Sequence, residues 1–358
     1  MANQTMRAID EARLNAFIER AIADAGAAMS ASLVVIGDKL GLYRALHRGG
    51  AMTSSELAQA TGTHERYVRE WLQNQAAGGY LTYDPATGRY ELPPEQALML
   101  ADESSPLFAQ GLFQIIEAVF ADEPRIAQAF RTGEGVGWHD HDGRLYEGTE
   151  RFFRPSYNAH LVSEWIPALE GVEKRLQAGA RVADVGCGLG ASTILMAQAY
   201  PASVFRGFDY HEGSIRGARE RAAAAGVEDR VEFGVATARE YPGEGYDFVA
   251  FFDCLHDMGD PVGAARHVLE TLSPEGTWMI VEPFAYDRPE ENLNPIGRMF
   301  YAASTMLCTP SSLAQEVGLG LGAQAGERRI ADVVRDGGFT RFRRAAETPF
   351  NLVYEARP

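Results

Sequence analysis

The stretch that decides the fold is Arg-Val-Ala-Asp-Val-Gly-Cys-Gly-Leu-Gly-Ala-Ser-Thr, residues 181–193. Its apolar first half predicts a buried strand, and the apolar run 191–199 predicts a following helix. Between them lie Gly186, Gly188 and Gly190. Glycine lacks a Cβ and tolerates positive φ, so this turn lets backbone approach a ligand closely. The turn also satisfies the dinucleotide fingerprint G-x-G-x-x-G/A, so alone it indicates only an adenosine-like ligand.

Asp184, two residues before the first glycine, helps to decide whether the adenosine-like ligand is a dinucleotide with a pyrophosphate or a cationic ligand. A pyrophosphate at a helix N-terminus needs positive potential around it, whereas a carboxylate there favours a cation. S-adenosylmethionine carries a sulfonium and an ammonium group and no phosphate. The spacing Asp-x-Gly-x-Gly-x-Gly resembles the first motif of class I S-adenosylmethionine-dependent methyltransferases. The resemblance implies S-adenosylmethionine as cofactor, with Asp184, Gly186 and Gly188 among its binding residues.

Strands and helices alternate from residue 181 onward, which predicts a parallel sheet. The predicted strands are 182–185, 204–208, 231–235, 248–252 and 278–282. A helix over 328–335, a Gly-Gly turn and two strands, 341–346 and 351–356, resemble the ending of class I methyltransferases. We therefore predict an α/β fold: a Rossmann-like, seven-stranded methyltransferase sheet with an antiparallel last strand, plus an N-terminal α-helical winged-helix domain.

Residues 1–100 are predicted to form the winged-helix domain, because helices over 11–48, from 53 and over 64–77 precede two short strands at 80–83 and 89–92. Residues 101–175 are predicted as a helical connector that covers the pocket, and 176–358 as the S-adenosylmethionine-binding domain. The winged helix could read DNA. However, its second helix mixes Arg66 and Arg69 with Glu65 and Glu70, whereas DNA readers concentrate basic residues. Dimerisation, as in many small-molecule O-methyltransferases, is the favoured role.

Two predicted strand ends supply residues for the adenosine part of the cofactor. Asp209 follows the second strand, where an acidic residue can bond both ribose hydroxyls. Its neighbour Tyr210 is expected beside the adenine. After the third strand, Ala236 and Thr237 stand where the family usually has an acid that accepts from the adenine amine. Since Thr237 replaces that acid, a hydroxyl or a backbone carbonyl must recognise the base.

The fourth strand ends in Phe252-Asp253 and continues into Leu255-His256-Asp257, at the end of the sheet that faces the ligand crevice. A similar segment in winged-helix O-methyltransferases carries the general base, and His256 is the matching position. An unperturbed histidine titrates near about 6.5, close to working pH. The alternative is that His256 only packs or caps a helix. Phe252 and Asp253 are expected at the cofactor, and Tyr157 or Arg154 at its methionine carboxylate.

Charge and residue composition limit the kinds of partner that the protein is expected to bind. A net charge of −16 argues against general attraction to nucleic acid or anionic membranes, and the sequence contains no long uncharged apolar run. Three cysteines, Cys187, Cys254 and Cys308, lack metal-ligand spacing and suggest reduced thiols in a cytoplasm. His139 and His141 stand in an irregular loop with two aspartates, for which an ordered pocket cover is favoured over a metal site. No metal is predicted.

The sequence therefore predicts a cytoplasmic, homodimeric methyltransferase that acts on a small, partly apolar acceptor. Oxygen is the favoured acceptor atom, with His256 as the general base. Methylation at nitrogen, carbon or sulfur remains open. One rival is a DNA-binding regulator that senses S-adenosylmethionine. The other rival is a nicotinamide oxidoreductase.

Overall fold

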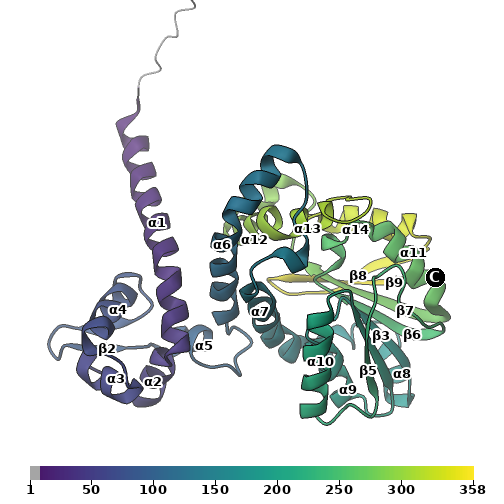
Figure 1. The fold of residues 1–358 in the computed structure, drawn as a ribbon, viewed down its shortest axis with the longest axis horizontal. Helices are drawn as coiled ribbons and strands as arrows, with labels where there is room; N and C mark the ends of the chain where they lie inside the picture. Colours follow the sequence, from purple (N-terminus) through teal and green to yellow (C-terminus); the bar gives the residue numbers. More distant parts are fainter. Residues whose placement is uncertain (1–8) are drawn as a thin grey trace, which may run out of the picture. The chain divides into compact units, whose positions relative to one another are not determined.

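The computed structural model describes residues 9–358, which form two compact units, 9–117 and 118–358 (Figure 1). The predicted connector, 101–175, is divided between these units, because helix α6 (Gln110–Thr132) begins in the first and continues into the second.

The amino-terminal unit has the predicted winged-helix pattern of helices followed by a hairpin. Its elements are α1 (Glu11–Lys39), α2 (Leu42–Gly49), α3 (Ser54–Thr61), α4 (Glu65–Ala77), β1 (Thr82–Asp84), β2 (Arg89–Glu91) and α5 (Pro94–Leu100). A core of Leu46, Leu57, Trp71 and Leu72 joins these helices. At the start of α3, Thr53 and Glu56 cap each other's backbone N–H groups, which fixes where the helix begins.

Helix α4 carries its arginines in ion pairs within the helix. Arg66 pairs with Glu70 and Arg69 pairs with Glu65, each across one helical turn. These pairs neutralise the face that a DNA-reading helix would present as basic.

The carboxyl-terminal unit is built on a seven-stranded sheet in the order β5-β4-β3-β6-β7-β9-β8. Strands β3 to β7 run parallel, and β9 pairs antiparallel with both β7 and β8. The fold class and the antiparallel ending are therefore confirmed. The strands are β3 (Arg181–Val185), β4 (Val204–Asp209), β5 (Val231–Val235), β6 (Tyr246–Phe252), β7 (Leu272–Pro283), β8 (Arg341–Glu347) and β9 (Asn351–Arg357).

Helices cover both faces of this sheet (Figure 1). The helices of this unit after α6 are α7 (Arg144–His160), α8 (Val172–Ala178), α9 (Ala191–Ala199), α10 (Glu212–Ala224), α11 (Pro261–Thr271), α12 (Pro295–Ala303), α13 (Thr309–Leu313) and α14 (Gly326–Asp336). Short helical turns complete the unit: η1 (Trp138–Asp140), η2 (Leu161–Trp165), η3 (Leu255–Asp257), η4 (Pro289–Asn292) and η5 (Ser304–Cys308).

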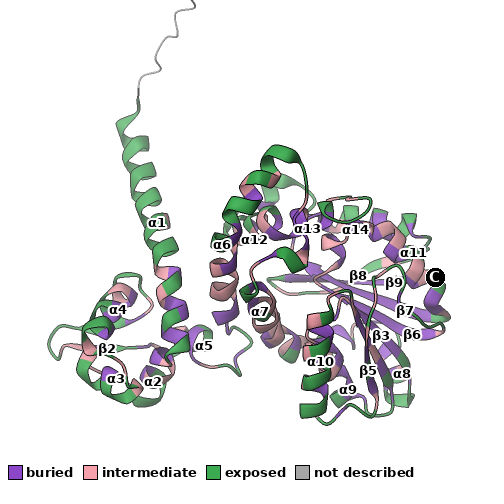
Figure 2. Ribbon diagram, in the orientation of Figure 1, coloured by how far each residue is buried: buried purple, intermediate pink, exposed green. Residues whose placement is uncertain are grey.

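Two apolar cores lie on the two faces of the sheet, because successive strand residues point to opposite sides. Val182 and Phe248 pack on the face with α8, α9 and α10, whereas Ala183 and Val249 pack on the face with α11 and α14. The inner strands β3, β6, β7 and β9 are consequently buried almost throughout, whereas the edge strand β8 has no buried residue (Figure 2). Such burial holds the carboxyl ends of the strands rigidly in place.

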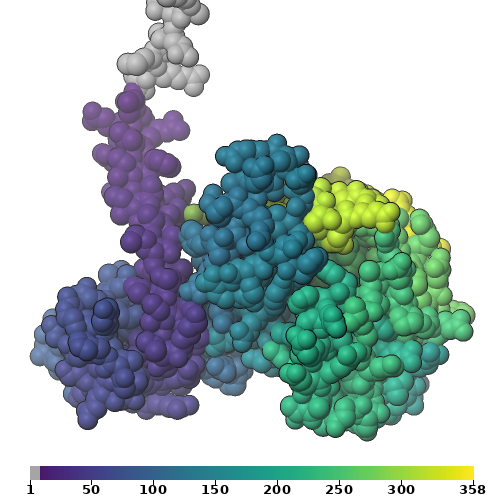
Figure 3. Space-filling model, in the orientation of Figure 1, coloured from purple at the N-terminus to yellow at the C-terminus, as the bar shows by residue number. Residues whose placement is uncertain are grey.

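Helix α1 differs from the other helices in its exposure. It is long and apolar enough to cross a membrane by length and composition, and little of that stretch is buried. A core helix of a soluble protein passes the same test, so this finding does not overturn the expectation of no membrane span. The first turns of α1 extend beyond the rest of their own unit (Figure 3).

Candidate active site

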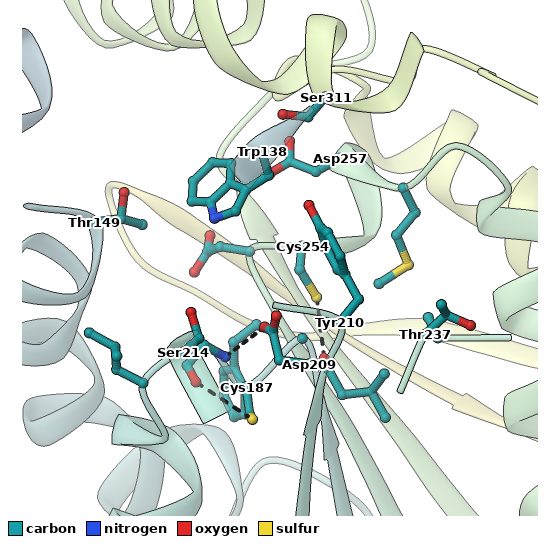
Figure 4. Close-up of a pocket in the computed structure, with 18 of the residues that line it drawn as sticks. Trp138, Thr149, Cys187, Asp209, Tyr210, Ser214, Thr237, Cys254, Asp257 and Ser311 are labelled. Atoms are coloured by element: carbon teal, nitrogen blue, oxygen red, sulfur yellow. Dashed lines mark hydrogen bonds between the residues drawn. The ribbon is translucent and has the colours of Figure 1, made fainter. Parts of the chain in front are cut away.

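A cavity of about 410 Å³ opens at the carboxyl ends of β3, β4, β5 and β6 (Figure 4). This volume is in the range of small-molecule sites, and this edge of a parallel sheet is where such folds bind ligands. Of the predicted binding residues, those that line the cavity are Gly186, Gly188, Asp209, Tyr210, Ala236, Thr237, Phe252, Asp253 and Tyr157. Asp184 and His256 do not line it.

The glycine turn forms the floor of the cavity. Gly186, Gly188 and Gly190 all have positive φ, at 75°, 51° and 79°. A Cβ on Gly186 would lie 2.7 Å from Cys254 Sγ, so only glycine fits between the two strand ends. A Cβ on Gly188 would meet nothing within 4 Å, which leaves its backbone open for a ligand to approach.

Asp184 lies beneath this turn and is fully buried. One of its oxygens accepts hydrogen bonds of 2.6 Å from the hydroxyls of Ser192 and Thr193, in the first turn of α9. Burial raises the pKa of Asp184 to about 6, although the two hydroxyls oppose the shift. Asp184 ties the turn to the helix that follows it, and its direct contact with a cationic ligand stays a prediction.

Asp209 projects from the end of β4 into the cavity. Its carboxylate accepts the backbone N–H of Gly188 at 3.0 Å and that of His211 at 2.8 Å. Burial raises the pKa of Asp209, and these two N–H groups oppose the shift. Tyr210 also faces the cavity, and Thr237 stands across it on the segment after β5 (Figure 4).

Asp253 is a half-buried carboxyl group at the end of β6, where it lines the cavity. It accepts hydrogen bonds from Tyr157 Oη at 2.9 Å and Asn351 Nδ2 at 2.8 Å. Burial and the nearby Glu282 raise the pKa of Asp253 to about 8. Its φ of 50° is left-handed, a strained conformation for a residue other than glycine. A strained, nearly neutral acid at a cavity is a candidate ligand-binding group.

His256 lies behind the cavity wall. Its Nδ1 is 2.7 Å from Glu282 Oε2, and its Nε2 is 3.1 Å from Asp257 Oδ1. Burial alone would lower the pKa of His256, but the two carboxylates raise it well above its usual value. His256 does not line the cavity, and its role as general base stays a prediction. Its neighbour Asp257 is the residue that faces the cavity.

Several lining residues lie outside the predicted set. Trp138 and Tyr146 form part of the wall, and Ser311 lies near Asp257 (Figure 4). Trp138 belongs to the loop expected as a pocket cover. In that loop the buried His141 Nδ1 lies 2.8 Å from Asp122 Oδ2, which anchors the loop to α6. A lone tryptophan in an irregular segment gives no periodic signal, so only its proximity to the two histidines could have singled it out.

The fold and the site together define a class of protein. A Rossmann-like sheet with an antiparallel β9, a glycine turn after β3 and an acid after β4 are the features of S-adenosylmethionine-dependent methyltransferases. Residues 176–322 match the methyltransferase domain family, and residues 27–102 match the Rv2258c-like winged HTH domain family. The chain thus combines a winged-helix domain with an S-adenosylmethionine-dependent methyltransferase domain.

Individual relatives agree with this class. The chain is 33% identical to 27-O-demethylrifamycin SV methyltransferase of Amycolatopsis mediterranei over 169 residues, which cover 45% of this chain and 57% of that protein. It is 24% identical to the mitomycin biosynthesis 6-O-methyltransferase of Streptomyces lavendulae over 279 residues, 73% and 76% of the two chains. The structure of mitomycin 7-O-methyltransferase superposes with a TM-score of 0.69 at 21% identity, over 98% of this chain and 100% of that one, and shares its fold.

Proposed function

We propose that this protein transfers a methyl group from S-adenosylmethionine to an oxygen atom of a small, partly apolar acceptor. The observation that carries the proposal is the cavity at the carboxyl ends of β3–β6, where the open Gly188 backbone and the Asp209 carboxylate meet an aromatic wall. The methyl group would come from the sulfonium of the cofactor, which leaves as S-adenosylhomocysteine, and the proton of the acceptor hydroxyl would pass to a carboxylate that lines the cavity. The relatives named as O-methyltransferases support oxygen as the acceptor atom.

The residues present fit such a cofactor. Asp209 offers a carboxylate for the ribose hydroxyls, and Tyr210 and Thr237 are near enough to bound the adenine. Asp253 offers a carboxylate to the cofactor's ammonium group, because a cation is what a desolvated acid binds best. Tyr157 Oη already donates to Asp253 and so holds it in place.

The chain's own contribution to the reaction is alignment and exclusion of water. Displacement at a sulfonium needs the acceptor atom in line with the methyl group, and positioning of this kind supplies a large part of a rate enhancement. Phe153 and Tyr157 stack with ring centroids 6.0 Å apart, and Trp138 adds a further apolar surface. These rings can hold a flat apolar acceptor against the cofactor.

The charge of the cavity restricts the acceptor. Five carboxylates line it, from Glu150, Asp209, Asp257, Asp260 and Glu316, beside the nearly neutral acid Asp253. Arg239 is the one basic side chain among the lining residues of the described chain, and it is paired with Asp260 and Glu316. We therefore propose a neutral or cationic acceptor, since a phosphate or carboxylate would meet like charge.

Isothermal titration calorimetry with S-adenosylmethionine and with NADH tests the cofactor. We expect binding of S-adenosylmethionine alone, weakened about 10- to 100-fold in Asp209→Ala by loss of charge-assisted hydrogen bonds. Labelled S-adenosylmethionine with a panel of neutral, cationic and anionic hydroxylated acceptors then tests the transfer. Tight NADH binding without S-adenosylmethionine binding would contradict the proposal, and labelling confined to anionic acceptors would contradict the acceptor class.

We also propose a homodimer assembled through α1. One face of this helix carries exposed apolar side chains spaced four or seven residues apart: Leu14, Ile18, Ile22 and Met29. Charged residues on the other faces of α1, Arg13, Glu19 and Arg20 among them, favour a water-bounded protein partner over lipid. The facing apolar stripe of a second copy is the simplest cover for this surface.

Sedimentation velocity tests the assembly. Ile18→Asp with Ile22→Asp should convert a dimer to a monomer, because two charges would be buried in the apolar contact. Ala23→Asp, on the opposite face of α1, is the matched control and should remain dimeric. A monomeric wild-type protein, or one that partitions into neutral lipid vesicles through α1, would contradict the proposal.

A further inference from the structure

Three side chains with different ligand atoms converge behind the cavity wall. One ring nitrogen of His256, one carboxylate oxygen of Asp257 and Cys308 Sγ lie within 4.8 Å of one another. They come from two segments that are far apart in sequence, η3 and η5. His256 and Cys308 are buried, and Asp257 reaches the cavity.

The contact between Glu282 and His256 favours His256 as a metal ligand rather than as one half of a simple ion pair. A histidine that binds a metal through one ring nitrogen nearly always gives the other to a carboxylate, which fixes its orientation. Glu282 Oε2 supplies that partner to His256 Nδ1 at 2.7 Å. The pair therefore leaves His256 Nε2 aimed at Asp257, 3.1 Å away.

Two polar atoms at the cluster lack hydrogen-bond partners within the described residues. Asp257 Oδ1 is buried, and its approach to His256 Nε2 does not have hydrogen-bond geometry. The hydroxyl of Ser311, a residue only 1% exposed, also has no partner, and it lies near Asp257 on the cavity wall (Figure 4). Buried polar atoms are normally satisfied, so both indicate a ligand that completes the site.

The backbone on both sides is held in place. Gln315 donates to the carbonyl of Asp257 at 2.9 Å and accepts from the N–H of Gly259 at 3.1 Å. Ser312 donates to the carbonyl of Met258 at 2.8 Å. These bonds join the backbone of η3 and the two residues after it to α13 and the segment after α13.

We propose that His256, Asp257 and Cys308 bind a divalent cation of the zinc class. One nitrogen, one oxygen and one sulfur ligand suit Zn²⁺ and not Mg²⁺ or Ca²⁺, which take oxygen ligands. Three protein ligands leave a fourth position of the tetrahedron, as in catalytic zinc sites. Because Asp257 lines the cavity, the fourth position would be open to the cavity beside it. A water molecule, or the hydroxyl or thiol of an acceptor, could occupy that position.

Titration of the chelator-treated full chain with Zn²⁺, followed by calorimetry, gives the first test. We expect one Zn²⁺ per chain and a melting temperature that rises with Zn²⁺ concentration, because a ligand that binds only the folded state stabilises it. Glu282→Gln should weaken binding about 10- to 100-fold through the orientation of His256.

Cobalt substitution gives the second test, since Co²⁺ reports a sulfur ligand by a charge-transfer band. The band should appear in the wild type, disappear in Cys308→Ser and persist in the matched control Cys187→Ser, whose thiol lies in the glycine turn. X-ray absorption at the zinc edge of the wild type should show one sulfur ligand, and this readout does not depend on the folding of any variant. A wild type without one-to-one binding, a zinc site without sulfur, or a band that follows Cys254 instead would overturn the proposal. None of these measurements contains cofactor or acceptor, so their failure is separate from failure of the proposed methyl transfer.

Discussion

At the scale of single residues, Asp253 illustrates how burial turns a common side chain into a binding group. The carboxyl lies in a cavity wall, is desolvated, and has Glu282 as a neighbour, so its pKa is raised to about 8. A neutral acid at neutral pH has little attraction for a cation. Approach of an ammonium group changes this, because a nearby positive charge favours the ionised form.

Cofactor binding near pH 7 should therefore release a proton from Asp253. The ammonium of S-adenosylmethionine would lower the pKa of Asp253 from about 8 to below the ambient pH. Calorimetry in two buffers of different ionisation enthalpy measures the number of protons released. Asp253→Asn, which keeps the left-handed backbone accessible because asparagine tolerates it, should release none.

S-adenosylhomocysteine is the control for this experiment. It retains the ammonium group but lacks the sulfonium charge, so it should release the same proton. Release with S-adenosylmethionine alone would place the sulfonium, not the ammonium, at Asp253.

At the scale of elements, the turn between β3 and α9 needs glycine at position 190 for two separate reasons, and Gly226, after α10, is a comparison position to which only one of them applies. Gly190 has a φ of 79°, and a Cβ there would lie 2.7 Å from the ring of Phe233. Gly226 has a φ of 65°, with nothing within 4 Å of the place of a Cβ. The two positions share backbone strain and differ in steric contact.

Gly190→Ala should lower the free energy of unfolding more than Gly226→Ala does. The left-handed conformation alone costs about 1–2 kcal/mol for a residue with a Cβ. At Gly190 the contact with Phe233 adds an overpacking cost of about 1–3 kcal/mol. Urea denaturation of both variants and the wild type measures the difference. Equal losses would mean that Phe233 moves aside without cost.

The short turn η3 shows why adjacent residues take different roles. His256 and Asp257 are consecutive, yet His256 points to Glu282 behind the wall and Asp257 lines the cavity. In such a tight turn neighbouring side chains diverge around the axis. A motif that matches both residues cannot tell which one reaches the ligand.

At the scale of the whole molecule, two buried acids make stability depend on pH. Burial raises the pKa of Asp184 to about 6 and, with Glu282, that of Asp253 to about 8, against about 3.9 for an unfolded aspartate. A raised carboxyl pKa means that the folded state prefers the neutral form. Its contribution is complete below about pH 4 and is lost as pH rises through the folded value.

The free energy of unfolding of the cofactor-free protein should therefore fall between about pH 4 and about pH 8, by at most about 1.4 kcal/mol per pH unit for each group. Asp253→Asn should flatten the part of this fall above about pH 6. Glu56 and Asp142, whose hydrogen-bond and arginine partners lower their pKa to about 2, lose stability only at more acidic pH and do not mask the effect. Urea denaturation across this range measures it, and a flat profile would contradict it.

The sequence by itself determined the sheet, the cofactor class and the position of the ligand edge. Alternation of apolar strands with helices is a local, periodic signal, and the turn at 186–190 needs glycine for reasons of backbone geometry alone. The winged-helix pattern was predictable on the same ground, because the caps and turns of α3, α4 and the hairpin lie within a few residues of each other.

Only the tertiary structure decided which side chains reach the cavity. Asp184 precedes the glycine turn but bonds Ser192 and Thr193 beneath it, and His256 is enclosed by Glu282 and Asp257. Cys308 meets His256 through contacts between segments separated by some fifty residues. Side-chain direction, desolvation and pairing depend on neighbours that are distant in sequence, and no local pattern encodes them.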